Sequence, residues 1–406
     1  MAVGPATFPA KMHNVSGFEL GTASAGIKTP GRKDVVLMRV CEGASVVGVF
    51  TKNSFCAAPV SICKEHLSKT AARYLIVNTG NANAGTGEEG WNDAVATCSA
   101  VAELCDVDIA AVLPFSTGVI GEKLPVEKLI SALPKAKAVL SENGWLDAAE
   151  GILTTDTRLK GASQQYTYKG KTVTLTGISK GSGMIKPNMA TMLGYVATDA
   201  GVEPELLQKL LIEATDCSFN RITVDGDTST NDSCMLVATG KSGVVVSESD
   251  QEGLSAFKQA LTAVMQELAH AIIRDGEGAT KFVTVEVESA ASQDEVLRTA
   301  FDIAHSPLVK TALFASDPNW GRILAVVGRA GIENLDLNAL QIFLGDVCIV
   351  SNGGRDAGYT EEAGQAVMDA EEILIRVVLN RGDITERVWT TDLSHDYVSI
   401  NADYRS

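Results

Sequence analysis

Two periods of hydrophobic positions run through the chain, one typical of strands and one typical of helices. Short apolar runs over 35–40, 44–50, 73–78 and 110–121 are rich in β-branched residues, and the segments between them contain glycine or proline. Such runs are typical of buried strands, because helices need longer periodic segments. We therefore expect a series of short strands in the first part of the chain.

Helical spacing appears between and after these runs. Ala94, Cys98, Val101 and Cys105 recur every three or four residues and would share one face of a helix. Pro204 opens a leucine-rich segment, and the first turn of a helix suits proline. The expected helices cover 91–105, 125–140, 143–153, 202–219 and 253–273.

The last part of the chain returns to β-rich sequence. Runs over 281–287, 372–380 and 387–393 are rich in β-branched residues, and Asn380–Asp383 predicts a turn between the last two. The pattern as a whole is that of a mixed α/β protein. A chain of 406 residues is too long for one ordinary core, so we expect two domains or one large interleaved core. No linker rich in proline and serine divides the chain, and we expect its halves to pack together.

Composition narrows the classes of function. Hydrophobic residues make up 45% and charged residues 21%, which is typical of a globular protein. The formal net charge of -16 disfavours nucleic acid or an anionic membrane as a partner and favours a small-molecule substrate. No apolar run reaches the roughly 18 residues of a membrane span, and the first residues do not resemble a secretory signal. The eight cysteines form no Cys-x-x-Cys pair, which favours buried free thiols in the cytoplasm and disfavours a metal site.

Three motifs suggest chemistry that their details disfavour. The stretch Gly85–Gly90 matches a dinucleotide-binding pattern, but Glu88 and Glu89 would repel a pyrophosphate. The stretch 225–236 starts like a calcium loop but lacks the glycine and the final glutamate, so we expect a hydrogen-bonded turn. Ser394, His395 and Asp396 are neighbours, which on an extended segment would point to alternate faces and could not form a triad.

The segment 184–193, MIKPNMATML, offers chemistry that needs no histidine. A threonine hydroxyl can be activated by the free α-amine of the same residue, whose ordinary pKa of about 7.7–8.0 suits a base. The amine of Thr191 would be released if its hydroxyl attacked the carbonyl of Ala190, giving an ester that water cleaves. Gly181 and Gly183 would allow the strained backbone that this step needs. From composition alone, the alternative is that segment 184–193 is an ordinary loop that is not cleaved.

A set of long motifs resolves this choice. KGSGMIKPNMATM, followed by LGYVATDA, closely resembles the self-cleaving junction of the ornithine acetyltransferase family, also called glutamate N-acetyltransferase, a bifunctional arginine-biosynthesis family. The resemblance covers essentially the whole chain and includes AGIKTPGRKDV, VNTGNANAGTG, LPFSTGVIGEKLP, ILTTDT, SFNRITVDGDTSTNDS, RDGEGATKF, DPNWGRI and DYVSINADYRS.

The resemblance implies a function and a set of residue roles. Acetyl would pass from N-acetylornithine to Thr191 and then to glutamate by a ping-pong mechanism, with Thr117 and Gly118 as the oxyanion hole. Cleavage between Ala190 and Thr191 would give an α chain, 1–190, and a β chain, 191–406. The implied substrate contacts are Thr157, Lys180, Thr191, Glu277, Asn401 and Ser406, the last standing where many relatives end in threonine.

The resemblance also implies a fold and an assembly. The expected fold is a layered α/β/β/α core of mixed sheets, shared with self-cleaving aminopeptidases, in which the two chains interleave. Relatives form (αβ)2 heterotetramers, and no cofactor is expected. Whether acetyl-CoA is also a donor stays open. The alternatives are an aminopeptidase or amidohydrolase of the same fold with a terminal nucleophile, and an uncleaved binding protein for an acidic amino acid.

Overall fold

A computed structural model describes residues 2–5, 8–186 and 192–403. The chain forms two compact units. The larger unit comprises Thr7–Asn220 and Asp227–Ile272, and the smaller unit comprises Met1–Ala6, Arg221–Gly226 and Ile273–Ser406. Ala190, Thr191 and Ser406 lie outside the described residues.

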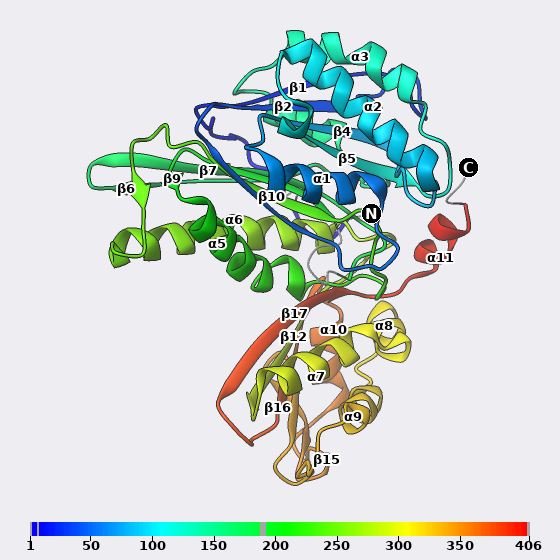
Figure 1. Cartoon of the computed structure of the whole chain (residues 1–406). Helices are drawn as coiled ribbons and strands as arrows, with labels where there is room; N and C mark the ends of the chain where they lie inside the picture. The colour runs from blue at the N-terminus through cyan, green and yellow to red at the C-terminus, as the bar shows by residue number, and fades with distance from the viewer. Residues whose placement is uncertain (1, 6–7, 187–191, 404–406) are drawn as a thin grey trace. The chain divides into compact units, whose positions relative to one another are not determined.

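The first sheet of the larger unit has the strand order β1-β2-β4-β5 (Figure 1). Its strands are β1 (Phe18–Ala23), β2 (Val35–Val40), β4 (Tyr74–Asn81) and β5 (Val112–Val119). Apolar residues on one face of this sheet pack against α1 (Ala58–Lys69), α2 (Gly87–Cys105) and α3 (Val126–Ala138). Both faces of the sheet are covered, which explains the mostly apolar sequences of β2 and of the first half of β4.

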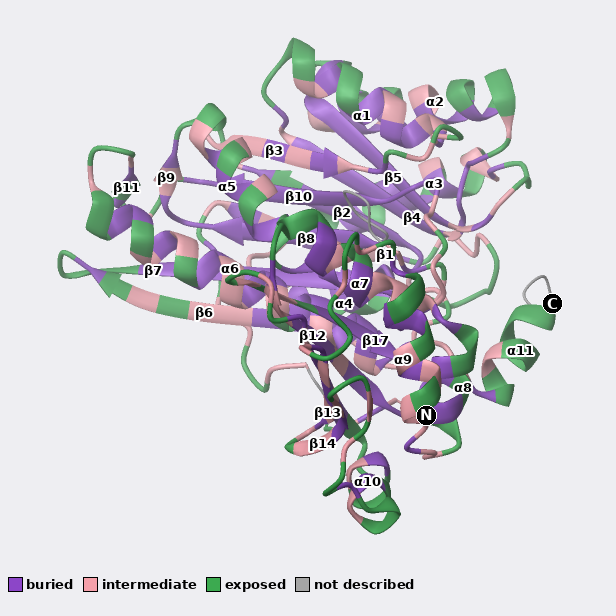
Figure 2. Ribbon diagram, turned by 90° about the horizontal axis from the view of Figure 1, so that it is seen from below, coloured by how far each residue is buried: buried purple, intermediate pink, exposed green. Residues whose placement is uncertain are grey.

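The second sheet has the order β3-β10-β8-β7-β6. Its strands are β3 (Ser45–Phe50), β10 (Ser233–Ala238), β8 (Leu193–Thr198), β7 (Lys171–Lys180) and β6 (Lys160–Tyr168). β8 and β10 are buried throughout and appear purple in Figure 2. α5 (Pro204–Asp216) and α6 (Gln251–Arg274) lie beneath this sheet in Figure 1. Strands from both sides of the predicted cleavage point therefore share one sheet.

A single core joins the two sheets. It contains Phe18 and Met38 from the first sheet and Tyr195 and Val237 from the second, and α4 (Trp145–Gly151) adds Trp145. The rings of Phe115 and Tyr195 form a T-shaped pair, nearly perpendicular to each other, with their centroids 5.3 Å apart. The larger unit thus has the layered α/β/β/α arrangement that the family resemblance predicts. Two short strands, β9 (Gly201–Val202) and β11 (Val245–Val246), pair separately.

The smaller unit is built on a sheet of order β15-β14-β13-β16-β12-β17. Its strands are β12 (Phe282–Ala290), β13 (Gln341–Leu344), β14 (Val347–Ser351), β15 (Gly354–Arg355), β16 (Glu372–Val378) and β17 (Ile384–Thr391). The apolar face packs against α7 (Gln293–His305), α8 (Pro307–Phe314), α9 (Trp320–Arg329) and α10 (Glu361–Met368). Among the described residues, no helix is long and apolar enough to cross a membrane.

The strands and helices expected from the sequence are present, but the segment near the C-terminus was misread. His395 and Asp396 are helical, because α11 (His395–Ala402) begins here and the Ser394 hydroxyl accepts the backbone N–H of Tyr397 as an N-cap. His395 packs edge-on against Phe314 with ring centroids 5.5 Å apart, which agrees with a structural role. All eight cysteines are free thiols, as the sequence predicted, but only Cys63, Cys98 and Cys234 are buried, so the expectation of burial was wrong for the others.

Candidate active site

β8 begins at Leu193, two positions after the predicted nucleophile in the sequence. Leu193 pairs with Lys180 of β7 on one side and with Ser233 of β10 on the other. The Ser233 N–H also donates to the Met192 carbonyl at 2.9 Å. Lys180, a predicted substrate contact, therefore ends its strand beside the residue that follows Thr191 by two positions.

A buried carboxylate, Asp156, fixes the end of β7. Its side chain is 0% exposed, and its Oδ1 accepts hydrogen bonds from Lys160 Nζ at 2.6 Å and from the Gly181 N–H at 2.7 Å. Burial alone would raise the pKa of Asp156. The positive charges of Lys160 and Lys180, with hydrogen bonds from Lys160 and the Thr154 backbone, outweigh burial and hold that pKa well below its usual range. Asp156 is therefore an ionised anchor next to Lys180.

The loop that carries Asp156 also carries Thr157, another predicted substrate contact. Thr157 is exposed, immediately after the buried Asp156 side chain. One residue before the anchor, the Thr155 and Ser182 hydroxyls lie 2.7 Å apart within hydrogen-bond distance. Two consecutive residues of this loop thus hold it against Gly181 and Ser182, and Thr157 is presented beside the end of β7.

The predicted oxyanion residues lie at the end of β5. Gly118 has a φ of +135°, a conformation that side chains rarely adopt. A Cβ atom at this position would lie 2.3 Å from the carbonyl carbon of Gly80 and 2.5 Å from the Asn81 nitrogen. The backbones of β4 and β5 approach too closely here for any residue but glycine. Thr117, one residue earlier, is 5% exposed.

Thr117 and Gly118 lie within β5, paired with Thr79 and Gly80 of β4, and do not form a turn. Asn231 connects this end of β5 to the second sheet. Its amide nitrogen Nδ2 donates to the Ser116 carbonyl at 2.9 Å and to the Ala82 carbonyl at 2.6 Å. Asn231 is buried and stands two residues before Ser233, which bonds to Met192. Through these bonds the Thr117–Gly118 end of β5 is held at the same end of the larger unit as the start of β8.

The smaller unit brings together two other predicted contacts. Asn401 Nδ2 donates to Glu277 Oε2 at 2.9 Å, although 124 positions separate them. Ser394, the N-cap of α11, donates its hydroxyl to the Gly278 carbonyl at 2.6 Å. Gly278 has a φ of +68°, and a Cβ there would lie 2.5 Å from the Tyr397 nitrogen. The close contact between this loop and α11 therefore depends on glycine and sets the Glu277–Asn401 pair.

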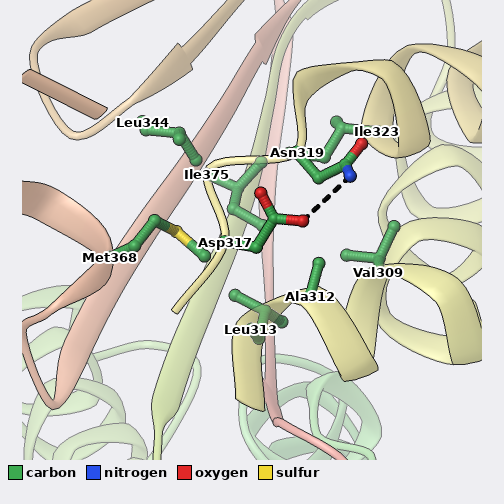
Figure 3. A pocket seen from close by; sticks show the side chains of 9 residues that line it. All are labelled: Val309, Ala312, Leu313, Asp317, Asn319, Ile323, Leu344, Met368 and Ile375. Atoms are coloured by element: carbon green, nitrogen blue, oxygen red, sulfur yellow. Dashed lines mark hydrogen bonds between the residues drawn. The ribbon is translucent and has the colours of Figure 1, made fainter. Parts of the chain in front are cut away.

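A pocket elsewhere in the smaller unit does not have the features of an amino-acid site. Figure 3 shows Asp317 among apolar side chains, with Asn319 Nδ2 donating to its Oδ2 at 3.0 Å. The empty volume is about 230 Å³, and the lining contains no cationic residue that could hold a substrate carboxylate: Val309, Ala312, Leu313, Asp317, Asn319, Ile323, Leu344, Met368 and Ile375. The pocket is also smaller than the roughly 300 Å³ at which ligand sites begin.

Three residues at the site in the larger unit were not predicted from the sequence: Asp156, Asn231 and Asp232. Asp156 precedes the predicted contact Thr157 in TTDT, so its position was a usable signal. Asn231 and Asp232 belong to the stretch for which the sequence predicts a hydrogen-bonded turn. The turn is present, and the Asn231 N–H donates to the Ser229 hydroxyl at 3.2 Å. The position of this turn beside β8 depends on the pairing of distant strands, so it could not be predicted from the local sequence.

Comparison with known proteins agrees with this architecture. The model of the ArgJ family matches residues 19–406. The arginine biosynthesis bifunctional protein ArgJ of Pseudomonas fluorescens (strain Pf0-1) is 60% identical over 407 aligned positions, covering 100% of both chains. The protein of the same name from Pseudomonas syringae pv. tomato is also 60% identical with 100% coverage of both. A crystal structure of ArgJ from Bacillus halodurans is 40% identical, with a TM-score of 0.50, and the match covers 52% of this chain and 99% of that one. The chain therefore belongs to the ArgJ family.

Proposed function

We propose that this protein transfers the acetyl group of N2-acetyl-L-ornithine to L-glutamate, giving L-ornithine and N-acetyl-L-glutamate. The observation that carries this proposal is the match of 60% identity over the full length of ArgJ proteins named for arginine biosynthesis. The protein is a glutamate N-acetyltransferase that acts in arginine biosynthesis. Acetyl-CoA is proposed as a second donor for glutamate, because the matched relatives are named bifunctional.

The proposed reaction has two halves that share Thr191. Its hydroxyl attacks the acetyl carbonyl of N-acetylornithine, the amide bond breaks, and ornithine leaves with the proton that the hydroxyl gave up. The glutamate amine then attacks the acetyl ester, and the Thr191 hydroxyl re-forms. The α-amine of Thr191 accepts and returns the proton in each half, which is why the chain must first be cleaved.

Two further groups of residues are proposed to serve this reaction. The Thr117 hydroxyl and the Gly118 N–H stabilise the negative oxygen of each tetrahedral intermediate, a role in which one donor typically contributes about 2.7–4 kcal/mol. Lys180 binds the carboxylate of the substrate, and Glu277 binds its ammonium group. Thr157, Asn401 and Ser406 donate or accept the remaining hydrogen bonds. The Asn401–Glu277 bond supports a shared role for these two residues.

The proposal includes self-cleavage between Ala190 and Thr191, into an α chain of residues 1–190 and a β chain of residues 191–406. One finding supports it: the solved Bacillus halodurans chain is matched almost entirely, over 99% of its length, by only 52% of this chain. That relative was therefore solved as a chain of about half this length. We further propose an (αβ)2 assembly and a cytoplasmic location, which suits eight free thiols.

Intact mass of the denatured protein tests the cleavage. We expect the parent to give two fragments, 1–190 and 191–406, and Thr191→Ala to give one intact chain. Thr191→Ser is the matched control, because serine keeps the hydroxyl and should still cleave. An intact parent chain would contradict the proposal, since Thr191 would then lack its base.

The products formed from N-acetylornithine and glutamate test the transfer itself. Purified parent protein should form N-acetylglutamate and ornithine in equal amounts, and Thr191→Ala should form neither. Free acetate without N-acetylglutamate would identify a hydrolase of the same fold and overturn the transferase assignment. Replacing N-acetylornithine by acetyl-CoA in the same assay tests the second donor.

A further inference from the structure

Asp392 is a buried carboxylate to which the proposed acetyl-transfer mechanism gives no role. It is 4% exposed and immediately follows β17 in the smaller unit. Its Oδ1 accepts the backbone N–H groups of Thr280 and Lys281 at 2.8 and 3.0 Å, and its Oδ2 accepts the Thr280 hydroxyl at 2.6 Å. One side chain therefore fastens the end of β17 to the residues that lead into β12, its neighbour in the sheet.

The fastened residues belong to the loop that carries Glu277, a proposed substrate contact. The Ala279 N–H donates to the Gly276 carbonyl at 2.9 Å, which closes a four-residue turn with Glu277 as its second residue. Thr280 follows this turn directly. The bonds to Asp392 thus fix the chain three residues after Glu277, and the turn cannot shift without breaking them.

The chain that follows Asp392 carries a second proposed contact, Asn401. Two residues after Asp392, the Ser394 hydroxyl caps α11 and donates to the Gly278 carbonyl at 2.6 Å. None of the residues of α11 is buried, so the burial of apolar side chains contributes little to the position of this helix. Polar bonds at its start hold it against the Glu277 turn, where Asn401 Nδ2 donates to Glu277 Oε2 at 2.9 Å.

The end of β17 is itself fixed by α8. Lys310 Nζ donates to the Thr390 hydroxyl at 3.0 Å, and the Leu393 N–H donates to the Lys310 carbonyl at 3.2 Å. The residues on both sides of Asp392 are therefore held by one helix of the smaller unit. A binding group is placed accurately only when the groups that support it are themselves held in place, and Asp392 meets this condition.

We propose that Asp392 is a positioning residue for N-acetylornithine, which holds the Glu277 turn and the start of α11 together so that Asn401 orients the Glu277 carboxylate. The bond from Asn401 uses Oε2 of Glu277 and leaves Oε1 for the side-chain ammonium group of the substrate. This inference rests on the proposed function and adds the residue that builds its ammonium site. Glutamate has no side-chain ammonium group, so its binding does not use this contact.

Steady-state kinetics of the complete enzyme test the proposal, because a ping-pong mechanism separates the two substrates. N-acetylornithine reacts with the free enzyme and glutamate with the acetylated enzyme, so kcat/KM for each substrate reports one half of the reaction. Asp392→Ala removes all three acceptor contacts. We expect kcat/KM for N-acetylornithine to fall about 10- to 100-fold, as a small misplacement of a binding group would cause, and kcat/KM for glutamate to stay within about twofold of the parent value.

Two variants control for the loss of a carboxylate as such. Asp392→Asn keeps an oxygen that can accept the two N–H groups, so it should recover part of the loss. Asp356→Ala is the matched control, because Asp356 also accepts a backbone N–H, from Gly358 at 2.8 Å, and a hydroxyl, from Ser351 at 2.6 Å, in the same unit. Asp356→Ala should have the kcat/KM values of the parent. Equal losses for both substrates in Asp392→Ala would show general damage and overturn the positioning role, as would unchanged values.

Glu277→Gln tests whether Asp392 acts through Glu277. This variant removes the charge that binds the ammonium group, so it should show the same selective loss for N-acetylornithine. In the Glu277→Gln background, Asp392→Ala should add little further loss, because both substitutions damage one contact. If the two losses multiply, Asp392 acts elsewhere and the inference fails.

Thr280 keeps the test decisive if Asp392→Ala does not fold. Thr280 is exposed, and Thr280→Val removes only the hydroxyl that donates to Asp392 Oδ2, whereas Thr280→Ser keeps it. A selective loss for N-acetylornithine in Thr280→Val but not in Thr280→Ser supports the proposal, and equal kinetics of the two variants reject it. A parent enzyme that transfers no acetyl would overturn the proposed function itself. Parent transfer with unchanged kinetics in Asp392→Ala would overturn only the role of Asp392.

Discussion

Lys160 of the larger unit and Lys310 of the smaller unit are both almost completely buried, but they differ in what they bond to. Lys160 of the larger unit is 0% exposed and donates to the Asp156 carboxylate at 2.6 Å. Lys310 of the smaller unit is 4% exposed and donates to neutral oxygens, the hydroxyls of Thr390 and Thr391 and the Thr391 carbonyl. One ammonium group is thus part of an ion pair, and the other is bound only by dipoles.

The difference appears in the pKa values of the two regions. Burial lowers the pKa of Lys310 to about 8, because Asp392 and Asp225 only partly compensate for the lost water. In the larger unit the charge of Lys160 helps to keep the pKa of Asp156 low despite its complete burial. A buried ion pair therefore holds a fixed charge beside the candidate site, whereas a buried lysine among neutral acceptors becomes titratable near physiological pH.

The largest expected effect comes from breaking the ion pair. Lys160→Met should leave Asp156 as a buried charge without its main partner and destabilise the larger unit by about 3–5 kcal/mol. Urea unfolding is best measured in the uncleaved Thr191→Ala background, where a single chain unfolds. The midpoint should fall clearly relative to Thr191→Ala alone.

Two controls show whether the effect belongs to burial. Removing both charges, with Asp156→Leu and Lys160→Met together, should restore much of the stability, because no unpaired charge remains. Lys209→Met removes an exposed pair in the same unit, in which Lys209 Nζ lies 3.0 Å from Glu248 Oε1 and both side chains are more than half exposed. It should leave the midpoint unchanged. Equal losses in Lys160→Met and Lys209→Met would show that burial does not distinguish the pairs.

Neither buried lysine could be assigned its partner from the sequence, although much of the fold could. β2 (VVLMRV) and the first half of β4 (YLIV) are mostly apolar runs and were readable as strands. The hairpin of β6 and β7 was missed, although Lys169 and Gly170, with φ of +48° and +76°, make the kind of two-residue turn that joins such strands. Lys160 and Asp156 are four positions apart and give no sign of burial, because that depends on the strands packed around them.

In the candidate site, too, some features could be predicted from the sequence and others could not. The family motifs predicted the positions of Thr117, Gly118, Lys180 and Glu277, because long motifs preserve local sequence. Ser233 pairs with Leu193, 40 positions earlier in the chain, and local sequence does not encode such a pairing. The start of α11 was misread because none of its residues is buried, so it has no apolar period to detect.

A smaller effect, confined to alkaline pH, is expected at Lys310. Between pH 8 and the ordinary lysine pKa of 10.5, folded Lys310 has lost its proton while the unfolded chain keeps it. The unfolded state then binds more protons, so this residue makes the protein more stable as pH rises, by up to roughly 3 kcal/mol across the window. Below pH 8 both states are protonated and the contribution is constant.

Lys310→Met isolates this contribution, because it removes the titrating group and fills the site with an apolar side chain of similar length. Tyrosines and cysteines that titrate in the same window are unchanged and cancel when the two proteins are compared. The stability of the parent minus that of Lys310→Met, from urea unfolding between pH 7 and 10.5, should be flat up to about pH 8 and then rise. A flat difference throughout would mean that Lys310 keeps its proton in the fold. Hydrogen bonds to neutral oxygens would then hold a buried charge as well as the carboxylate of Asp156 does, and the contrast between the two lysines would disappear.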